Sequence, residues 1–384
     1  MSLEALVNGR VLGDEGFVDR AVLIEHGRIA DIVAADDARV RGAKVRDLGG
    51  ALLLPGFLDL QVNGGGGVLF NDDPSVASIR AIGAAHRRFG TTGFLPTLIS
   101  DDLSVVERAI AAARAAIVER VPGVVGVHIE GPFLSPARKG AHDAAKFRDL
   151  GSRFVELLAM LDNGRTLVTL APERTTPGVI AELRAAGVVI SAGHTNATYA
   201  QVAEAIDSGM TGFTHLFNAM SPLGSREPGA VGAALENDRT WCGIIVDGWH
   251  VDPVVLRIAL RAKARERFML VTDAMPIVGS EQATFTLQGR TIHVEDGKCV
   301  DELGTLTGSA LDMASAVRNA VRLLGLSLED AARMASTWPA EFLGLGRELG
   351  RIAPGYRASL VLADDDLNVI DTWIDGRSTG SAHD

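Results

Sequence analysis

Three side chains of the kinds that bind zinc stand at the ends of three separate apolar runs of the sequence. Glu130 ends the run VVGVHIE, His194 ends VVISAGH, and His215 lies in GFTHLFN. One carboxylate and two imidazoles form a zinc ligand set that leaves a fourth position open, as catalytic zinc sites do. A single buried histidine is more often a hydrogen-bonded core residue, but three such ends together predict a metal site.

A fourth ionisable side chain, Asp273, follows the apolar run FMLVT. A buried carboxylate without a partner is costly, so Asp273 needs a cation, a hydrogen-bond donor or a chemical role. A hydrogen bond to a neighbouring loop would be a purely structural explanation. The position of Asp273 at the end of an apolar run favours a general base, which takes a proton from a water that a metal has made more acidic.

The stretch FLDLQVNGGGG (57–67) places polar residues inside an apolar run. Asp59, Gln61 and Asn63 occupy alternate positions, so they would share one face of a strand. The two amides are weak zinc ligands compared with imidazole, and the residue types alone leave the role of this face open. No Gly-Lys-Ser/Thr follows the glycines at 64–67, so we interpret them as a mobile turn rather than a phosphate cradle.

The elements that must position these residues are strands that alternate with helices. Strand-like runs rich in β-branched residues recur along the central part of the chain, mostly separated by alanine-rich segments with helical spacing. Such alternation indicates a parallel sheet covered by helices. Eight units favour a (β/α)8 barrel of the TIM type over a doubly wound open sheet, and chemistry lies at the carboxyl ends of barrel strands. The runs cover residues 52–62, 93–98, 124–130, 166–173, 188–194, 212–218, 242–248 and 268–274.

The two ends of the sequence have a different pattern. Residues 3–33 look like hairpin strands with a turn at His26-Gly27, and the tail from Gly350 again looks like strand, turn and strand. Neither end can bury a core alone, so we predict that the ends form one small β-sandwich domain beside the barrel. The predicted limits are 1–54 plus 345–384 for the small domain and 55–344 for the catalytic barrel.

The composition narrows the class of protein. The chain of 384 residues carries a net charge of −11, which argues against nucleic acid as a partner because phosphates require a basic face. No apolar run reaches the length of about 18 residues needed for a membrane span, and no secretion signal is expected at MSLEALVNGR. Cys242 and Cys299 are the only cysteines, so we expect a reduced, cytoplasmic protein.

Five segments carry more information than a pair of histidines: HIEGPFLSPARKGAHD (128–143), SAGHTNA (191–197), THLFNAMSPLGSREPG (214–229), DGWHV (247–251) and VTDAM (271–275). Together they resemble the N-acetylglucosamine-6-phosphate deacetylases of the amidohydrolase superfamily, over essentially the whole chain. The resemblance implies hydrolysis of the acetamide of N-acetyl-D-glucosamine 6-phosphate to D-glucosamine 6-phosphate and acetate, in amino-sugar catabolism or recycling.

The resemblance also implies how the metal is held. Many amidohydrolases carry a His-x-His pair at the end of strand 1, where this chain has Gln61 and Asn63. We therefore expect one divalent metal ion per subunit, zinc, rather than two. The implied metal ligands are Glu130, His194 and His215. The implied catalytic residues are Asp273 and His142. The residues implied to form hydrogen bonds around them are Gln61, Asn63 and His128.

The implied substrate contacts surround this centre. His142 would contact and polarise the acetyl carbonyl oxygen, while Arg226 and His250 would bind the phosphate. The family often completes its phosphate pocket across a dimer interface, so we expect a homodimer. Trp249 stands where a histidine is common, so the outer pocket is expected to differ in shape. The implied substrate-binding residues are Ala141, His142, Asn218, Ala219, Arg226, Asp247, His250, Leu306, Thr307 and Gly308.

Three alternatives remain open from the sequence. The first is the 4-epimer as substrate, N-acetylgalactosamine 6-phosphate, because no residue fixes the pocket around O4. The second is an amidohydrolase-like interaction protein without a metal, which the complete set of four site residues disfavours. The third is an acylated-amino-acid or cyclic-amide hydrolase, which the HLFNAM and SREPG segments disfavour.

Overall fold

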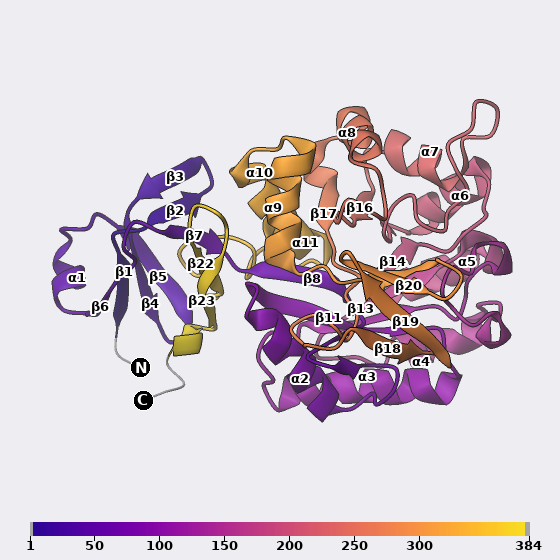
Figure 1. Ribbon diagram of the computed structural model, residues 1–384, viewed down its shortest axis with the longest axis horizontal. Coiled ribbons are helices and arrows are strands. Elements are labelled where there is room, and N and C mark those ends of the chain that lie inside the picture. The colour runs from indigo at the N-terminus through magenta and orange to yellow at the C-terminus, as the bar shows by residue number, and fades with distance from the viewer. Residues whose placement is uncertain (1–2, 381–384) are drawn as a thin grey trace.

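The computed structural model describes residues 3–380, and its centre is a barrel of parallel strands. Eight strands pair side by side in chain order, and a parallel bridge between Val62 and Ala274 links the first strand to the end of the last. This confirms the predicted (β/α)8 barrel (Figure 1). The barrel strands are β8 (Phe57–Val62), β11 (Thr91–Ile99), β12 (Gly126–Glu130), β13 (Arg165–Leu170), β14 (Val189–Ala192), β15 (Gly212–Phe213), β16 (Trp241–Ile244) and β17 (Phe268–Leu270).

Helices surround this sheet, and their ends are encoded locally. In α6, the side chain of Thr198 accepts a hydrogen bond from the N–H of Gln201 while Gln201 bonds back, which forms a capping box. Apolar residues at helical spacing then face the barrel. No described helix is long and apolar enough to cross a bilayer. The helices of the barrel region are α2 (Val76–Arg87), α3 (Leu103–Val118), α4 (Val155–Leu158), α5 (Pro177–Ala185), α6 (Tyr199–Ser208), α7 (Gly229–Glu236), α8 (Pro253–Ala262), α9 (Met313–Leu324), α10 (Leu328–Ala335) and α11 (Thr337–Phe342), with short 3-10 turns at Pro136–Arg138, Ala144–Lys146, Ser152–Phe154, Pro172–Arg174 and Arg265–Arg267.

The two ends of the described chain meet in a β-rich region beside the barrel (Figure 1). Strand β22 near the C-terminus pairs with β7, which also pairs with β2 near the N-terminus. The predicted turn at His26-Gly27 is confirmed, because it joins β4 and β5. The predicted pairing of the ends is therefore present, while the exact domain limits stay a prediction. The region contains β1 (Glu4–Val7), β2 (Arg10–Gly13), β3 (Gly16–Asp19), β4 (Ala21–Glu25), β5 (Arg28–Val33), α1 (Ala38–Arg41), β6 (Lys44–Asp47), β7 (Leu52–Pro55), β22 (Leu360–Ala363), β23 (Val369–Ile374) and β24 (Arg377–Ser378).

The run at 52–62 is two strands rather than the single strand that the sequence suggested. Leu52–Pro55 forms β7 in the β-rich region, and Phe57–Val62 forms β8 in the barrel. The break falls at Gly56, where an added Cβ would lie 2.1 Å from the Thr92 hydroxyl. A continuous apolar pattern cannot reveal such a break, since both strands are buried on both faces.

The glycines at 64–67 form an ordered hairpin, which corrects the interpretation as a mobile turn. Strand β9 (Gly64–Gly65) pairs with β10 (Val68–Leu69), and the N–H groups of Gly66 and Gly67 donate to carbonyls of Val278 and Pro276. An added Cβ on Gly64 would lie 2.5 Å from the Val68 carbonyl oxygen. The glycines therefore serve close packing at the barrel mouth.

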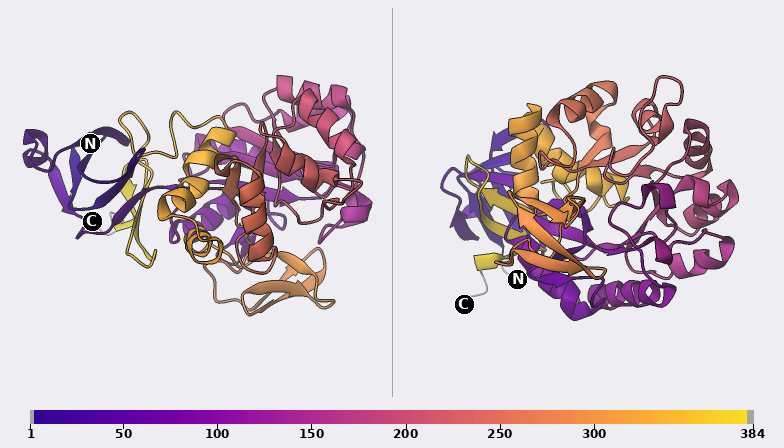
Figure 2. Two further views of the ribbon diagram at one scale, coloured as in Figure 1. Left: turned by 90° about the horizontal axis from the view of Figure 1, so that it is seen from above. Right: turned by 45° about the vertical axis from the view of Figure 1, so that its right-hand side comes forward.

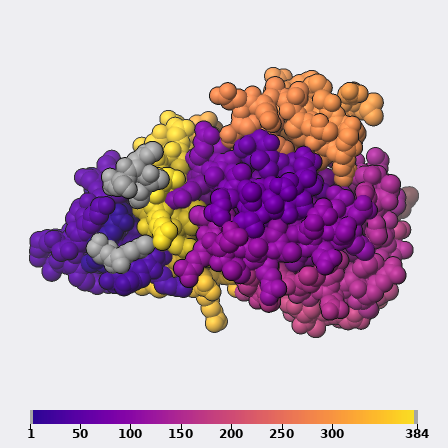
Figure 3. Space-filling model, turned by 90° about the horizontal axis from the view of Figure 1, so that it is seen from below, coloured from indigo at the N-terminus to yellow at the C-terminus, as the bar shows by residue number. Residues whose placement is uncertain are grey.

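A further four-stranded antiparallel sheet was not predicted. It stands out from the barrel as the orange ridge of Figure 3, and Figure 2 shows it beside the barrel rather than within it. Its inner side chains pack on Leu69, Ile99 and Met275 near the carboxyl ends of the barrel strands. The sheet therefore covers part of the barrel mouth. Its strands are β18 (Thr284–Leu287), β19 (Arg290–Glu295), β20 (Lys298–Asp301) and β21 (Leu306–Ser309).

Candidate active site

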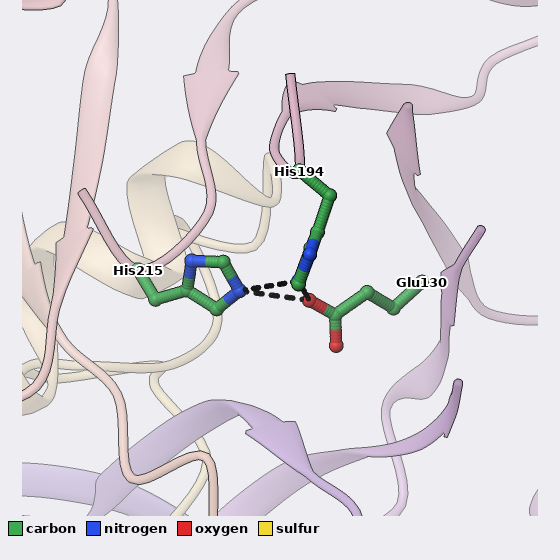
Figure 4. Close-up of side chains that lie close together, drawn as sticks. All are labelled: Glu130, His194 and His215. Atoms are coloured by element: carbon green, nitrogen blue, oxygen red, sulfur yellow. Dashed lines mark hydrogen bonds and ion pairs between the residues drawn. The ribbon is translucent and has the colours of Figure 1, made fainter. Parts of the chain in front are cut away.

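Glu130, His194 and His215 converge at the carboxyl end of the barrel. Oε1 of Glu130 lies 2.9 Å from Nε2 of His215 and 3.2 Å from Nε2 of His194, and the two Nε2 atoms are 3.1 Å apart. All three side chains are buried. Figure 4 shows them pointing toward one another. The structure therefore brings the three predicted ligands together from the ends of β12, β14 and β15.

This cluster fits a metal ion. Nδ1 of His194 lies 2.9 Å from the carbonyl oxygen of Arg138, so Nδ1–H donates to that carbonyl and Nε2 is the atom that can bind a metal. Zinc ligands at about 2.0–2.2 Å in a tetrahedron are about 3.3–3.6 Å apart, which is close to the observed separations. Three converging acceptor atoms without a cation would otherwise repel one another or share a proton.

The electrostatics of the cluster keep Glu130 ionised. Burial acts to raise the pKa of Glu130, but the hydrogen bonds with His194 and His215 outweigh burial and hold it well below its usual value. Burial acts to lower the pKa of His215, but its hydrogen bond with Glu130 and the negative charge raise the pKa overall. The cluster thus contains one ionised carboxylate, and its negative charge attracts positive charge, as a cation site requires.

Gln61 and Asn63 connect this cluster to Asp273. Nε2 of Gln61 donates to Oε2 of Glu130 at 3.1 Å and to Oδ1 of Asp273 at 3.0 Å. Nδ2 of Asn63 donates to the same Asp273 oxygen at 2.7 Å. The amides therefore hold the two carboxylates in place, which is consistent with their expected positions around the ligands. Asp59, which shares their strand face, lies deeper and accepts hydrogen bonds from Gln61 and Thr272.

Asp273 is held in an environment that raises its pKa. Burial and the nearby charge of Glu130 raise the pKa of Asp273 to about 6, although His215, His250 and Asn63 act in the opposite direction. A bound cation would lower this value, because positive charge favours the carboxylate. The group is therefore available to accept a proton near neutral pH.

Three of these site residues also have a strained backbone conformation. His194, His215 and Asp273 have φ values of 48°, 34° and 54°, a left-handed conformation that costs a residue other than glycine on the order of 1–3 kcal/mol. Each comes within a few residues after a barrel strand, where the chain turns sharply to aim the side chain into the mouth. The rest of the fold must stabilise these turns.

His142 enters the site with a defined proton position. Its Nδ1 accepts hydrogen bonds from the N–H of Ser100 at 3.3 Å and the hydroxyl of Ser100 at 2.8 Å. Burial and repulsion from His194 hold the pKa of His142 well below its usual value. The ring is therefore neutral with its proton on Nε2, so it can donate a hydrogen bond. Ser100 was not predicted as part of the site.

The three cluster residues line one cavity of about 200 Å³ together with Asn63, His142 and Asp273. Gly140, Met275 and Leu287 also line it, and Leu287 belongs to the unpredicted sheet. Among the residues predicted to bind substrate, those that line this cavity are Ala141, His142, Asn218, Ala219, His250, Leu306 and Gly308.

Three predicted substrate contacts lie outside the cavity lining. Asp247 instead holds His250, since its Oδ2 lies 2.6 Å from Nδ1 of that ring. Thr307 is fully buried between two lining residues of β21. Arg226 is exposed, on the segment between β15 and α7, part of which extends as a loop beyond the helices in Figure 1. Trp249 is 47% exposed and its ring lies 4.2 Å from Nζ of Lys298 on β20.

A chain of hydrogen bonds runs below the site and includes His128. Nδ1 of His128 lies 3.2 Å from Oγ1 of Thr97, and its Nε2 lies 2.7 Å from Oγ1 of Thr169. Oγ1 of Thr169 is 2.6 Å from Oγ1 of Thr214. Burial lowers the pKa of His128 to about 4, so the ring is neutral. Sequence reasoning missed the threonines, because threonine is common in any strand.

Comparisons with known proteins identify the family. Residues 52–379 match the amidohydrolase family. The chain is 48% identical to the N-acetylgalactosamine-6-phosphate deacetylase of Shewanella sp. (strain ANA-3), over 84% of this chain and 82% of the relative. It is 36% identical to the N-acetylglucosamine-6-phosphate deacetylase of Haemophilus influenzae, over 94% of each chain.

A solved structure agrees with these relatives. The crystal structure of N-acetylglucosamine-6-phosphate deacetylase from Pasteurella multocida superposes with a TM-score of 0.95 and 35% identity, covering 98% of this chain and 99% of that one. The barrel, the buried Glu-His-His cluster and these matches lead to one assignment. The chain is an enzyme of the amidohydrolase family and belongs to its amino-sugar 6-phosphate deacetylases.

Proposed function

We propose that this protein hydrolyses the acetamide of N-acetyl-D-glucosamine 6-phosphate, which yields D-glucosamine 6-phosphate and acetate. The observation that carries the proposal is the convergence of Glu130, His194, His215 and Asp273 in one cavity. Relatives named for this activity support the choice of substrate. Both cysteines are buried and free, which supports work in the reducing cytoplasm.

The three ligands would hold one divalent ion, which we propose is zinc. When bound, such an ion supplies Lewis-acid chemistry for attack of water on the acetyl carbonyl. The metal cluster has one imidazole pair, and the amides of Gln61 and Asn63, which donate their N–H groups to carboxylates, are weak zinc ligands compared with imidazole. A single ion per subunit follows from this donor set.

Asp273 is proposed to move the protons. It accepts a proton from the attacking water and later gives that proton to the departing amine, which is a poor leaving group without it. Burial and the nearby charge of Glu130 raise the pKa of Asp273, which favours proton uptake by this carboxylate over that of an exposed one. Gln61 and Asn63 would hold the carboxylate in position through the two hydrogen bonds to its Oδ1.

His142 is proposed to stabilise the oxyanion. Its Nδ1 is occupied by Ser100, so Nε2–H is the free donor for the carbonyl oxygen of the acetyl group. A donor positioned before the reaction stabilises the charge that develops on that oxygen. This role depends on Ser100, which keeps the proton on the productive nitrogen.

The phosphate is proposed to lie between two subunits. His250 lines the cavity with its Nδ1 held by Asp247, so its other ring nitrogen is available to the phosphate. Arg226 is exposed and outside the cavity of its own chain, which supports a contact to the cavity of a partner subunit. A guanidinium binds phosphate through two parallel hydrogen bonds. We therefore propose a homodimer with a shared phosphate site.

The 4-epimer, N-acetylgalactosamine 6-phosphate, is the second candidate substrate. The relative at 48% identity is named for that sugar, whereas the Haemophilus relative at 36% is named for the gluco sugar. Trp249 and Lys298 form a cation–π pair beside His250, so the outer wall of the pocket differs from one that carries histidine there.

One experiment tests the function and the substrate together. Acetate release from both phosphorylated sugars is measured with the full chain, and metal content is determined on the same sample. We expect turnover with at least one sugar at one equivalent of metal, and D273N as control should keep the metal but not the activity. Metal-loaded protein that releases acetate from neither sugar would contradict the proposal, and two equivalents of metal would contradict the single-ion site.

A further inference from the structure

The two histidines of the metal cluster are supported differently. Nδ1 of His194 donates to the Arg138 carbonyl. Nδ1 of His215 is also fully buried, but it has no hydrogen-bond partner among residues 3–380 that the structure describes. A buried polar atom without a partner costs about 1–3 kcal/mol. A metal-binding histidine normally donates its second N–H to an acceptor, which fixes the tautomer and the ring.

A small cavity lies next to His215 inside the barrel. It offers about 20 Å³ for the centre of a water molecule, which is enough for one water. The hydroxyls of Ser191 and Thr214 belong to its lining residues, and Phe342 of α11 is at its wall. All residues around it are buried. The cavity is thus surrounded by buried residues and contains polar groups. Its lining residues are Leu60, Gln61, His128, Leu167, Ser191, Phe213, Thr214, His215, Gly243, Met269, Val271 and Phe342.

The hydrogen-bond chain through His128 ends at this cavity. The hydroxyl of Thr97 lies 3.2 Å from the carbonyl oxygen of Leu95, and donation to that carbonyl assigns the proton of the neutral His128 to Nδ1, facing Thr97. In this assignment Nε2 accepts the proton of Thr169, and Thr169 accepts from Thr214. With its proton used in this way, the Thr214 oxygen has a free lone pair and needs a donor. Hydrogen bonds that run in one direction also strengthen one another.

We propose that a single buried water occupies this cavity and joins His215 to the hydrogen-bond chain that runs through His128 and ends at Thr214. The water accepts Nδ1–H of His215 and donates to Oγ1 of Thr214, with its second proton toward the hydroxyl of Ser191. The water would then give Nδ1 of His215 an acceptor and Oγ1 of Thr214 a donor. It also keeps the His215 lone pair on Nε2, where the metal cluster needs it. Thr214 and the water are therefore positioning groups for a ligand, and the inference rests on the metal site proposed above.

Gly243 allows the water to be displaced without disturbing the fold. A Cβ at Gly243 would lie 3.4 Å from Cγ1 of Val271 and 3.5 Å from the backbone N of His215, which are ordinary contacts. G243A therefore places a methyl group at the cavity wall. G178A is the matched control, because a Cβ at Gly178 meets only the Thr176 hydroxyl at 3.9 Å.

The experiment measures affinity for Zn²⁺ by competition with a chromogenic chelator, and melting temperature without metal. We expect G243A to bind Zn²⁺ about 10- to 100-fold more weakly than wild type, while G178A is unchanged. T214V removes the acceptor and should act in the same direction, and T214S, which keeps the hydroxyl, should restore the affinity. The melting temperatures of the metal-free proteins show whether each variant folds.

A crystal structure of the wild type supplies the direct readout. An ordered water within hydrogen-bonding distance of both Nδ1 of His215 and Oγ1 of Thr214 is expected. A cavity without that water, or affinities within twofold of wild type in both G243A and T214V, would overturn the proposal. Failure of the wild type to bind any divalent ion would instead contradict the proposed metal site, and the crystal structure would still decide on the water.

Discussion

The same backbone conformation serves two purposes in two regions of this molecule. In the β-rich region, His26 and Asp375 have positive φ at hairpin turns, where the chain reverses direction at the surface. In the barrel, His194 and His215 have positive φ although their side chains are buried. A turn adopts this conformation for local reasons, whereas a buried strand end keeps it only because the surrounding fold enforces it. Strain at the buried ends of these barrel strands therefore coincides with chemistry, and strain in the turns does not.

The largest effect is expected at the strained barrel end that carries Asp273. D273N keeps the shape of the side chain but cannot accept a proton, so kcat should fall by roughly 10²- to 10⁴-fold. Metal content should stay near that of the wild type, since Asp273 is not one of the three converging ligands. Steady-state kinetics and metal analysis on the same preparation provide the check, and kcat within tenfold of wild type would contradict the assigned role.

A second buried carboxylate of the barrel, Asp59, should make stability depend on pH. Burial raises the pKa of Asp59 to about 7, although hydrogen bonds from Thr272 and Gln61 oppose the change. The folded protein then holds a proton that the unfolded chain releases near pH 4, so stability falls as pH rises from about 4 to about 7. The loss between pH 5 and pH 8 should be about 3 kcal/mol.

D59N isolates this contribution, because an amide does not titrate. Thr272 can accept from the new amide N–H and donate to the Gln61 carbonyl at 3.3 Å, so the substitution fits the site. Urea unfolding at pH 5 and pH 8 should show a smaller decrease for D59N than for the wild type. An equal decrease in both proteins would mean that Asp59 does not carry the proton.

The next prediction concerns an exposed side chain, Arg226, rather than a buried one. R226A should raise KM for the phosphorylated sugar about 10- to 100-fold, since a hydrogen bond to a charged group is worth about 1.5–3 kcal/mol, and kcat should change little. R347A, which removes another exposed arginine, is the control. If KM for the phosphorylated sugar stayed unchanged in R226A, the phosphate contact would have to lie elsewhere.

The same comparison explains what the sequence could predict. Barrel strands and their polar ends were predictable, because apolar runs that end in Glu130 or His194 are rare and each run is continuous in sequence. The sheet from Thr284 to Ser309 was not, since its strands are partly exposed and its position over the barrel mouth depends on contacts far away in the chain. Ser100 and Thr214, which directly follow β11 and β15, were missed for another reason: a hydroxyl after a strand gives no sign of its hydrogen-bond partner.

The smallest effect is expected at the turn between β4 and β5. His26 has a φ of 51°. Glycine would remove the strain of this conformation, which stabilises the fold, but it would also increase the conformational entropy of the unfolded chain, which destabilises the fold. Each effect is about 1 kcal/mol, so the two nearly cancel. H26G should therefore shift the melting temperature by less than about 3 °C. G27A at the next position should destabilise more, because its φ is 79° and a Cβ there would lie 2.9 Å from the Asp375 carbonyl oxygen. Thermal unfolding of both variants checks this order. A larger loss in H26G than in G27A would mean that the turn, like the barrel ends, depends on a specific side chain.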